Sequence, residues 1–279
     1  AYARLGVEVT IIELAPRLLP RGDEELSDTL AQTLQAEGIR LELGAEVERV
    51  SQLDDVKKID LKGGKSIDTD ALLVAVGRRA CVESLNLASA NVNFDVRGIQ
   101  VDRKMRTSNK RVYACGDVTG EMPLTHVAEL QAGIIIANMM FKLPKKISYD
   151  VVPAVVYTDP EVAQVGLSVE QCKAHKHGEV HRFEVAELDR AVTDNARSGV
   201  AKILTVKGKV VGAHIIAPHA GELIHELALA VQQRMHISKI TSLVHAYPSY
   251  SQLNKRVAGQ YYKDRLFSGL SKRIVSLLW

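Results

Sequence analysis

The chain has 279 residues, of which 46% are hydrophobic, so it can bury a sizeable core, and its length predicts about two domains. Its formal net charge is only +3, from 36 basic and 33 acidic residues, and the basic residues are scattered, which gives no reason to expect nucleic acid as a partner. No apolar run approaches the roughly 20 residues of a membrane span, and the first residues lack the pattern of a signal peptide.

The three cysteines, Cys81, Cys115 and Cys172, are far apart in the sequence, and none belongs to a C-x-x-C pair. The spacing therefore indicates neither a zinc site nor a disulfide framework, and no metal site is expected. We expect each cysteine to be a small buried hydrophobe. This usage fits a reducing compartment, and we expect a cytoplasmic protein.

Residues 1–6 have the pattern of the end of a helix, which predicts that an N-terminal part is missing. Val7–Glu13 is β-branched and apolar, the pattern of a buried parallel strand. In a dinucleotide-binding βαβ unit, the acid that ends the second strand hydrogen-bonds the adenosine ribose. Glu13 occupies that position, or is an ordinary acid at a strand end, since the glycine fingerprint expected about 20 residues earlier is absent.

Residues 23–37 predict a helix, with acids in the first turn and one leucine stripe. Short strands and turns follow from Ile39 to Thr69, with Gly63-Gly64 as a hairpin turn. The run Asp70–Arg78 predicts a second buried strand, open at Gly77 and Arg78. The alternative is a core strand that ends in a glycine turn with a solvated arginine.

The run Lys110–Val118 predicts a buried strand whose C-terminal end, Gly116-Asp117, opens toward a ligand. Gly116 allows close approach to the backbone, and the Asp117 carboxylate can accept a hydrogen bond from a ligand hydroxyl. The predicted helix from Leu124 would direct its positive dipole end at a group that gains negative charge on reduction, which suits a flavin. The alternative is a plain turn into a loop.

The segment Thr107–Asp117, continued to His126–Glu129, resembles the second flavin motif of the FAD-dependent pyridine nucleotide-disulfide oxidoreductases. That family includes dihydrolipoamide dehydrogenase, glutathione reductase and mercuric reductase. The resemblance implies that Asp117, beside Gly116, holds the ribityl chain of FAD. It also places Leu124, Thr125 and His126 along the isoalloxazine edge, and Gly77 and Arg78 beside the bound nucleotide.

Two stretches, Leu5–Glu13 and Leu18–Asp23, are similar to the NAD domain of the same flavoenzymes. An acid at Glu13 favours NADH, because it would repel a 2′-phosphate. Arg17 and Arg21 lie close enough in the sequence to leave NADPH open.

The predicted helix from Leu124 ends near residue 141, and Leu143–Lys146 predicts a domain boundary. An antiparallel α+β pattern follows, with a capping box that begins at Ser168, a Lys207-Gly208 hairpin and a helix over 222–235. The run Tyr157–Leu167 resembles the start of the family's C-terminal interface domain, which implies a homodimer in which the partner completes each active site.

The predicted fold class is therefore α/β, with parts of two doubly wound nucleotide-binding domains followed by an α+β dimerisation domain. The expected domains are the rear of an NAD(P)-binding domain at 1–78, the rear of an FAD-binding domain at 79–147 and the dimerisation domain at 148–279. 

The run His245–Gln252 departs from the disulfide reductases of this family, which carry a second histidine and a glutamate where this chain has Tyr247 and Gln252. A tyrosine with a pKa near ~10 is a poor base at neutral pH, so a dihydrolipoamide- or glutathione-type dithiol mechanism is not expected. Mercuric reductases share the tyrosine, but they end in a vicinal cysteine pair that Val275–Trp279 lacks. His245 is a candidate ligand or acid, or a structural histidine.

The last stretch, 264–279, is an amphipathic basic pattern that packs on its own domain or lies on a membrane surface or partner. Two hypotheses follow. In the first, the chain is the C-terminal part of an oxidoreductase that passes a hydride from NAD(P)H to FAD and on to a disulfide, metal ion or other acceptor, with Tyr247, His245 and Gln252 at the substrate. In the second, it is a non-catalytic dimerising module that does not retain FAD alone.

Overall fold

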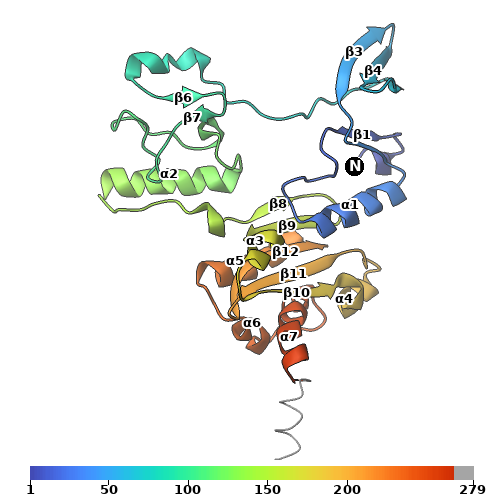
Figure 1. Ribbon diagram of the computed structural model, residues 1–279, viewed down its shortest axis with the longest axis vertical. Coiled ribbons are helices and arrows are strands. Elements are labelled where there is room, and N and C mark those ends of the chain that lie inside the picture. Colours follow the sequence, from blue (N-terminus) through green and yellow to red (C-terminus); the bar gives the residue numbers. More distant parts are fainter. Residues whose placement is uncertain (267–279) are drawn as a thin grey trace, which may run out of the picture. The chain divides into compact units, whose positions relative to one another are not determined.

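The computed structural model describes residues 1–266, and Figure 1 shows them as a ribbon. The α/β class is confirmed, since helices and four sheets alternate along the chain. The residues group into two units, one formed by Ala1–Leu72 with the chain from Pro153 onward, the other by Leu73–Val152. This grouping joins the first and last segments of the sequence, and the bounds of the three predicted domains stay a prediction.

The N-terminal segment forms half of a parallel βαβ arrangement. After a short 3-10 turn at Ala3–Leu5, strand β1 (Thr10–Glu13) pairs in parallel with β2 (Arg40–Leu43), and helix α1 (Glu24–Ala36) connects them. The helix begins as predicted, because the Asp23 carboxylate caps it by accepting from the Leu26 amide at 3.2 Å. The strand predicted over Val7–Glu13 is shorter and only half-buried, because β2 is the one described strand beside it.

An antiparallel meander follows, formed by β3 (Val47–Leu53), β4 (Val56–Leu61) and β5 (Ser66–Thr69). Gly63 and Gly64 both have positive φ in the turn between β4 and β5, which confirms the predicted hairpin.

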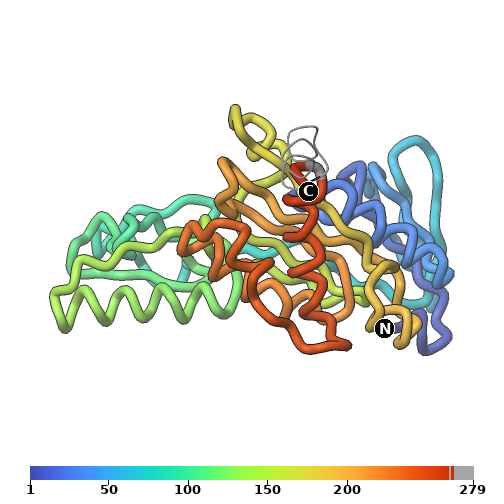
Figure 2. Tube along the Cα trace, turned by 90° about the horizontal axis from the view of Figure 1, so that it is seen from below, coloured from blue at the N-terminus to red at the C-terminus, as the bar shows by residue number. Residues whose placement is uncertain are grey.

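The C-terminal segment is built on a five-stranded antiparallel sheet in the order β10-β11-β12-β9-β8. Its strands are β8 (Ala154–Val156), β9 (Glu161–Gly166), β10 (Gly178–Glu184), β11 (Val200–Val206) and β12 (Lys209–Ala217). Its helices are α3 (Val169–Ala174), α4 (Asp189–Thr193), α5 (Ala220–Gln232), α6 (Ser238–Ser242) and α7 (Gln252–Leu266). Helix α5 packs on β9 and β12, and α7 packs on β10 and β11. Figure 2 shows α7 in red, near the C-terminal end of the colour range. The predicted capping box at Ser168 and the Lys207-Gly208 hairpin are confirmed.

The N-terminal and C-terminal segments share one core. Leu26 and Leu30 of α1 pack with Val200 of β11 and Ile216 of β12, and all four are at most 2% exposed. Because side chains alternate along a strand, Lys202 lies on the same face as Val200. Its ammonium group reaches Asp23 Oδ1 at 2.7 Å and Glu25 Oε2 at 2.8 Å. The helix that follows Glu13 is therefore anchored in the C-terminal sheet by apolar packing and by a buried ion pair.

The second unit contains little regular structure. Its elements are 3-10 turns at Glu83–Leu85, Leu87–Ala90, Asp117–Thr119 and Tyr149–Val151, the short hairpin of β6 (Phe94–Asp95) and β7 (Gly98–Ile99), and helix α2 (Thr125–Met140). Two small clusters form its core, one around Val82, Val92 and Ile99, the other around Met105 and Ile134.

Of the three buried strands predicted for the nucleotide-binding parts, two are wrong as elements. The run Asp70–Arg78 contains no strand, and Leu73, Val74 and Val76 are 81%, 69% and 94% exposed. The run Lys110–Val118 is reduced to one bridge, between Tyr113 and Arg106. The physical reason is that a strand of a parallel sheet takes its hydrogen bonds and its cover from neighbouring strands, and the described residues provide none here.

Other expectations also changed. Helix α2 buries Val127 and Ile134 but leaves Leu130 and Met139 exposed, because its apolar residues are distributed over all of its faces. Cys172 is buried as expected, whereas Cys81 and Cys115 are exposed. Cys115 lies in the run Lys110–Val118, where the predicted strand is absent. No helix among the described residues is long and apolar enough to cross a membrane. Most of the amphipathic pattern over 264–279 lies outside the described residues.

Candidate functional site

The Gly-Asp turn presents a carboxylate at the surface of the second unit. Gly116 has φ +80°, a conformation that favours glycine, and Asp117 begins the 3-10 turn that follows. The Asp117 side chain is 55% exposed, and its Oδ2 lies 3.5 Å from Nη1 of Arg78. Gly77, with φ +140°, directly precedes this arginine. The structure therefore brings together four of the predicted cofactor residues in one unit.

The backbone of this turn is held by a buried glutamine that sequence reasoning missed. The Gly116 amide donates to Gln131 Oε1 at 2.6 Å, and Gln131 Nε2 donates to the Tyr149 hydroxyl at 2.9 Å. Gln131 is 0% exposed, and burial raises the pKa of Tyr149. The signal was available, because Gln131 is a polar residue at helical spacing between the inward-facing Val127 and Ile134.

The first turn of α2 lies beside Gly116, since a Cβ added at Gly116 would meet the Ala128 Cβ at 3.4 Å. Leu124 precedes the helix without a side-chain cap and is half-buried, whereas Thr125 and His126 are exposed. The positive end of the α2 dipole therefore faces the same side of the unit as the Gly-Asp turn. Such an end can stabilise negative charge on a ligand.

Glu13 ends β1 in the first unit, at the carboxyl edge of the parallel pair. Its Oε1 accepts a hydrogen bond from the Ala15 amide at 2.8 Å, which fixes the turn after the strand. Arg17 points back into its own loop, where Nη2 donates to the carbonyls of Pro20 at 3.1 Å and Gly22 at 3.3 Å. Arg21 is exposed.

The predicted catalytic run lies between α6 and α7. Tyr247 is 68% exposed, whereas the His245 side chain is 5% exposed, so the two point to opposite sides of the segment. His245 Nε2 lies 3.2 Å from Glu226 Oε2 of α5. Gln252 is the half-buried first residue of α7. Tyr247 alone of the three predicted catalytic residues is open to a ligand in this chain.

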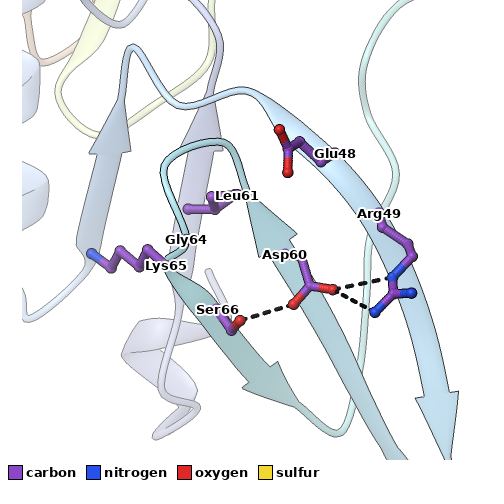
Figure 3. Close-up of a pocket in the computed structure, with 7 residues that line it drawn as sticks. All are labelled: Glu48, Arg49, Asp60, Leu61, Gly64, Lys65 and Ser66. Carbon is purple, nitrogen blue, oxygen red and sulfur yellow. Dashed lines mark hydrogen bonds and ion pairs between the residues drawn. The ribbon is translucent and has the colours of Figure 1, made fainter.

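A separate hollow of about 340 Å³ lies in the β3-β4-β5 meander, and Figure 3 shows its lining. The Asp60 carboxylate lines the hollow and accepts hydrogen bonds from Ser66 Oγ at 2.8 Å and from Arg49 Nε at 3.2 Å. These hydrogen bonds, that of Ser66 first, lower the pKa of Asp60. The lining contains none of the predicted site residues, and three of its polar side chains, Arg49, Asp60 and Ser66, bond one another. Within residues 1–266, no three His, Cys, Asp or Glu side chains gather in a way that could hold a metal ion.

Comparison with known proteins matches both parts of the chain. Residues 1–132 match the family model described as pyridine nucleotide-disulphide oxidoreductase, and residues 152–257 match the dimerisation domain of the same family. A mercuric reductase of Bacillus cereus is 35% identical over 272 residues, which is 94% of this chain and 43% of that protein. A dihydrolipoyl dehydrogenase of Chlamydia muridarum is 34% identical over 258 residues, covering 90% of this chain and 55% of that one.

Solved structures agree with these matches. The HOCl-induced flavoprotein disulfide reductase RclA of Escherichia coli has a TM-score of 0.85 at 26% identity, covering 92% of this chain and 60% of that chain. LpdA of Mycobacterium tuberculosis has a TM-score of 0.87 at 28% identity, covering 96% of this chain and 58% of that one. The chain spans about half the length of the curated relatives it matches.

Proposed function

The chain belongs to the class I pyridine nucleotide-disulphide oxidoreductase family, and from this premise we propose that it serves an oxidoreductase that passes a hydride from NAD(P)H to FAD and on to a disulfide, metal ion or other acceptor. The observation that carries the proposal is the exposed Asp117 carboxylate. Asp117 directly follows Gly116, which has a positive φ and lies beside the first turn of α2. A carboxylate in this position accepts hydrogen bonds from a sugar-alcohol chain.

The residues of the second unit fit a flavin in three ways. Asp117 would accept from ribityl hydroxyls, and the exposed Thr125 and His126, after Leu124, would lie along the ring edge. The positive end of α2 would favour a ring that gains negative charge, and Arg78 beside Asp117 adds positive charge. When bound, FAD supplies the two-electron chemistry that links the nucleotide to the acceptor.

We propose NADH rather than NADPH as the reductant. Glu13 lies at the strand end where an acid binds the ribose hydroxyls and repels a 2′-phosphate. The alternative rested on Arg17 and Arg21, and Arg17 is already committed to the carbonyls of Pro20 and Gly22. Ligand-observed NMR can measure the dissociation constants of NADH and NADPH from the chain. A lower dissociation constant for NADPH would contradict the choice.

We further propose a cytoplasmic homodimer formed through residues after about 152, in which Tyr247 of one chain faces the acceptor site of the other. The matched dimerisation domain supports the dimer, and the exposed Tyr247 supports the role. A tyrosine in this position donates a hydrogen bond or contacts a bound metal ion or thiol, and it does not serve as a base near neutral pH. Size-exclusion chromatography with light scattering tests the dimer, and monomer alone at micromolar concentration would contradict it.

A second candidate function is a dimerising module without a retained flavin. The exposed apolar run that includes Leu73, Val74 and Val76 favours it, because these side chains would be covered in an assembled nucleotide-binding sheet. The visible spectrum of the purified 279-residue chain separates the two. Near-stoichiometric flavin absorbance, lost in D117A, supports the oxidoreductase, whereas absence of flavin even with added FAD supports the module. A D117A spectrum equal to that of the wild type would contradict the assigned role of Asp117.

A further inference from the structure

Residues 243–251 form a segment whose side chains are divided between two sides. Val244 and Tyr247 are 87% and 68% exposed, whereas Tyr250 is 9% exposed and His245 has a side chain that is 5% exposed. A segment between two helices with strongly exposed apolar groups needs inward anchors, because otherwise its backbone would be free to move. The inward anchors therefore decide how Tyr247 is presented.

The anchor nearest Tyr247 is His245, and both of its ring nitrogens have partners. Nδ1 lies 3.3 Å from the Leu243 carbonyl oxygen. Nε2 faces Glu226 Oε2 at 3.2 Å. Neither nitrogen is open to a ligand, so His245 is a structural histidine in this chain.

Glu226 in turn is held from a second helix. Asn254 of α7, which is 1% exposed, donates from Nδ2 to Glu226 Oε2 at 2.8 Å and to the Leu223 carbonyl at 3.0 Å. The next residue, Lys255, donates to the Leu243 carbonyl at 3.0 Å. One carboxylate oxygen of α5 thus joins α7 to His245, and α7 also holds the start of the segment.

We propose that Glu226 is a positioning residue: its carboxylate fixes His245 between α5 and α7, and thereby holds Tyr247 outward, toward the second copy of the chain. The inference rests on the proposed function, which places Tyr247 at the acceptor site of a homodimer. It extends that function by naming the carboxylate that positions the segment. Gln252 lies where the family has a glutamate, and Glu226, on helix α5, supplies the carboxylate in this chain. Glu226 was missed in the sequence, although it is a polar residue among the inward-facing Leu223, Leu227 and Ala230.

The position of Tyr247 can be followed in the full 279-residue chain labelled with 3-fluorotyrosine, by ¹⁹F NMR. The Tyr247 signal is the one lost in Y247F, and the Tyr250 signal, lost in Y250F, reports whether the surrounding fold is intact. In E226L we expect the Tyr247 signal to narrow and to move toward the shift of free fluorotyrosine. E226Q keeps one acceptor oxygen but loses the charge, so its Tyr247 signal should move in the same direction as in E226L, by a smaller but measurable amount. Glu222 lies one turn earlier on α5 and is exposed, so E222L is the matched control and should match the wild type.

A Tyr247 signal that is unchanged in both E226L and E226Q, while the Tyr250 signal persists, would overturn the proposal. If E226L loses the Tyr250 signal because it does not fold, E226Q decides by the same criterion.

A double-mutant cycle on the dimer dissociation constant separates positioning from plain support of the fold. We expect E226Q to weaken the dimer about five-fold in the wild-type background and less than about two-fold in a Y247A background, since the two residues act through one contact. Equal weakening in both backgrounds would show that Glu226 supports the fold without acting through Tyr247, and would refute the inference. A wild-type chain that stays monomeric would refute the proposed dimer, and the Tyr247 signal would then decide the role of Glu226 by itself.

Discussion

The apolar, β-branched runs of the two units differ in structure. In the first unit, β1 and α1 are held against the C-terminal sheet by a shared leucine core and by the buried pair of Lys202 and Asp23. In the second unit, the run through Leu73, Val74 and Val76 forms no strand and is exposed. The difference shows that an apolar, β-branched sequence forms a strand only where a neighbouring strand supplies backbone hydrogen bonds and neighbouring elements cover its side chains.

Hydrogen exchange tests this contrast most strongly. The amides of β12, at the centre of the five-stranded sheet, should exchange at least about 10³-fold more slowly than those of residues 72–77, because the exposed run has no ladder to protect it. Peptide-resolved mass spectrometry after exchange measures the ratio. Protection of residues 72–77 equal to that of β12 would mean that this run is paired in solution, and the comparison would fail.

The buried ion pair provides the next largest effect. Lys202→Met leaves the Asp23 carboxylate without its ion-pair partner, whereas Glu25 keeps its ion pair with Arg182. The side chains of Lys202 and Asp23 are only 9% and 3% exposed. Removing one member of a buried pair costs about 3 kcal/mol or more in the free energy of unfolding, and we expect that loss here. Urea unfolding followed by circular dichroism measures it.

The matched control for this substitution is Lys62→Met, which breaks the pair with Glu46 on the meander. Both of its side chains are more than half exposed, at 66% and 53%, so we expect no measurable change in stability. If the two variants unfold at the same urea concentration, the pair of Lys202 and Asp23 does not hold the first unit together.

The sequence predicted helix starts, caps and turns well, and buried strands and tertiary contacts poorly. Residues 23–37, the capping box at Ser168 and the Lys207-Gly208 turn carry their own signals in caps, stripes and turn residues. The burial of Lys202 beside Asp23 has no such signal, because it joins positions that are 179 residues apart. Composition alone would place a lysine at the surface.

The candidate site shows the same division. The motif at Gly116 and Asp117 and the exposed Tyr247 could be found from the sequence, and their roles stay predictions. Gln131 and Glu226, which hold the two turns, could have been suspected as polar residues on apolar helix faces, but their partners Tyr149 and His245 are set by the packing of separate elements. The residues that carry the chemistry of a site can be recognised in short stretches of sequence, whereas the residues that hold them in place depend on the fold.

The smallest effect we predict is a pH dependence confined to the first unit. His214 on β12 is 4% exposed, its Nε2 donates to the Leu167 carbonyl at 2.9 Å, and burial lowers its pKa below the usual value. Below about pH 6.5, His214 binds a proton in the unfolded chain but not in the folded chain. The free energy of unfolding therefore falls as pH falls, until pH reaches the lowered pKa. The loss should be about 1.4 kcal/mol per pH unit at most within this window.

His214→Gln keeps a donor toward Leu167 and removes the titration, so its free energy of unfolding should change less between pH 7 and about pH 5.5 than that of the wild type. Carboxylates do not contribute much here, because their ordinary pKa values lie near about 4. His175 is exposed, and His175→Gln is the matched control, with a wild-type slope. Urea unfolding at each pH measures all three proteins. A wild-type slope in His214→Gln would show that the sheet around β12 admits the proton, and the first unit would then be less tightly closed than its packing indicates.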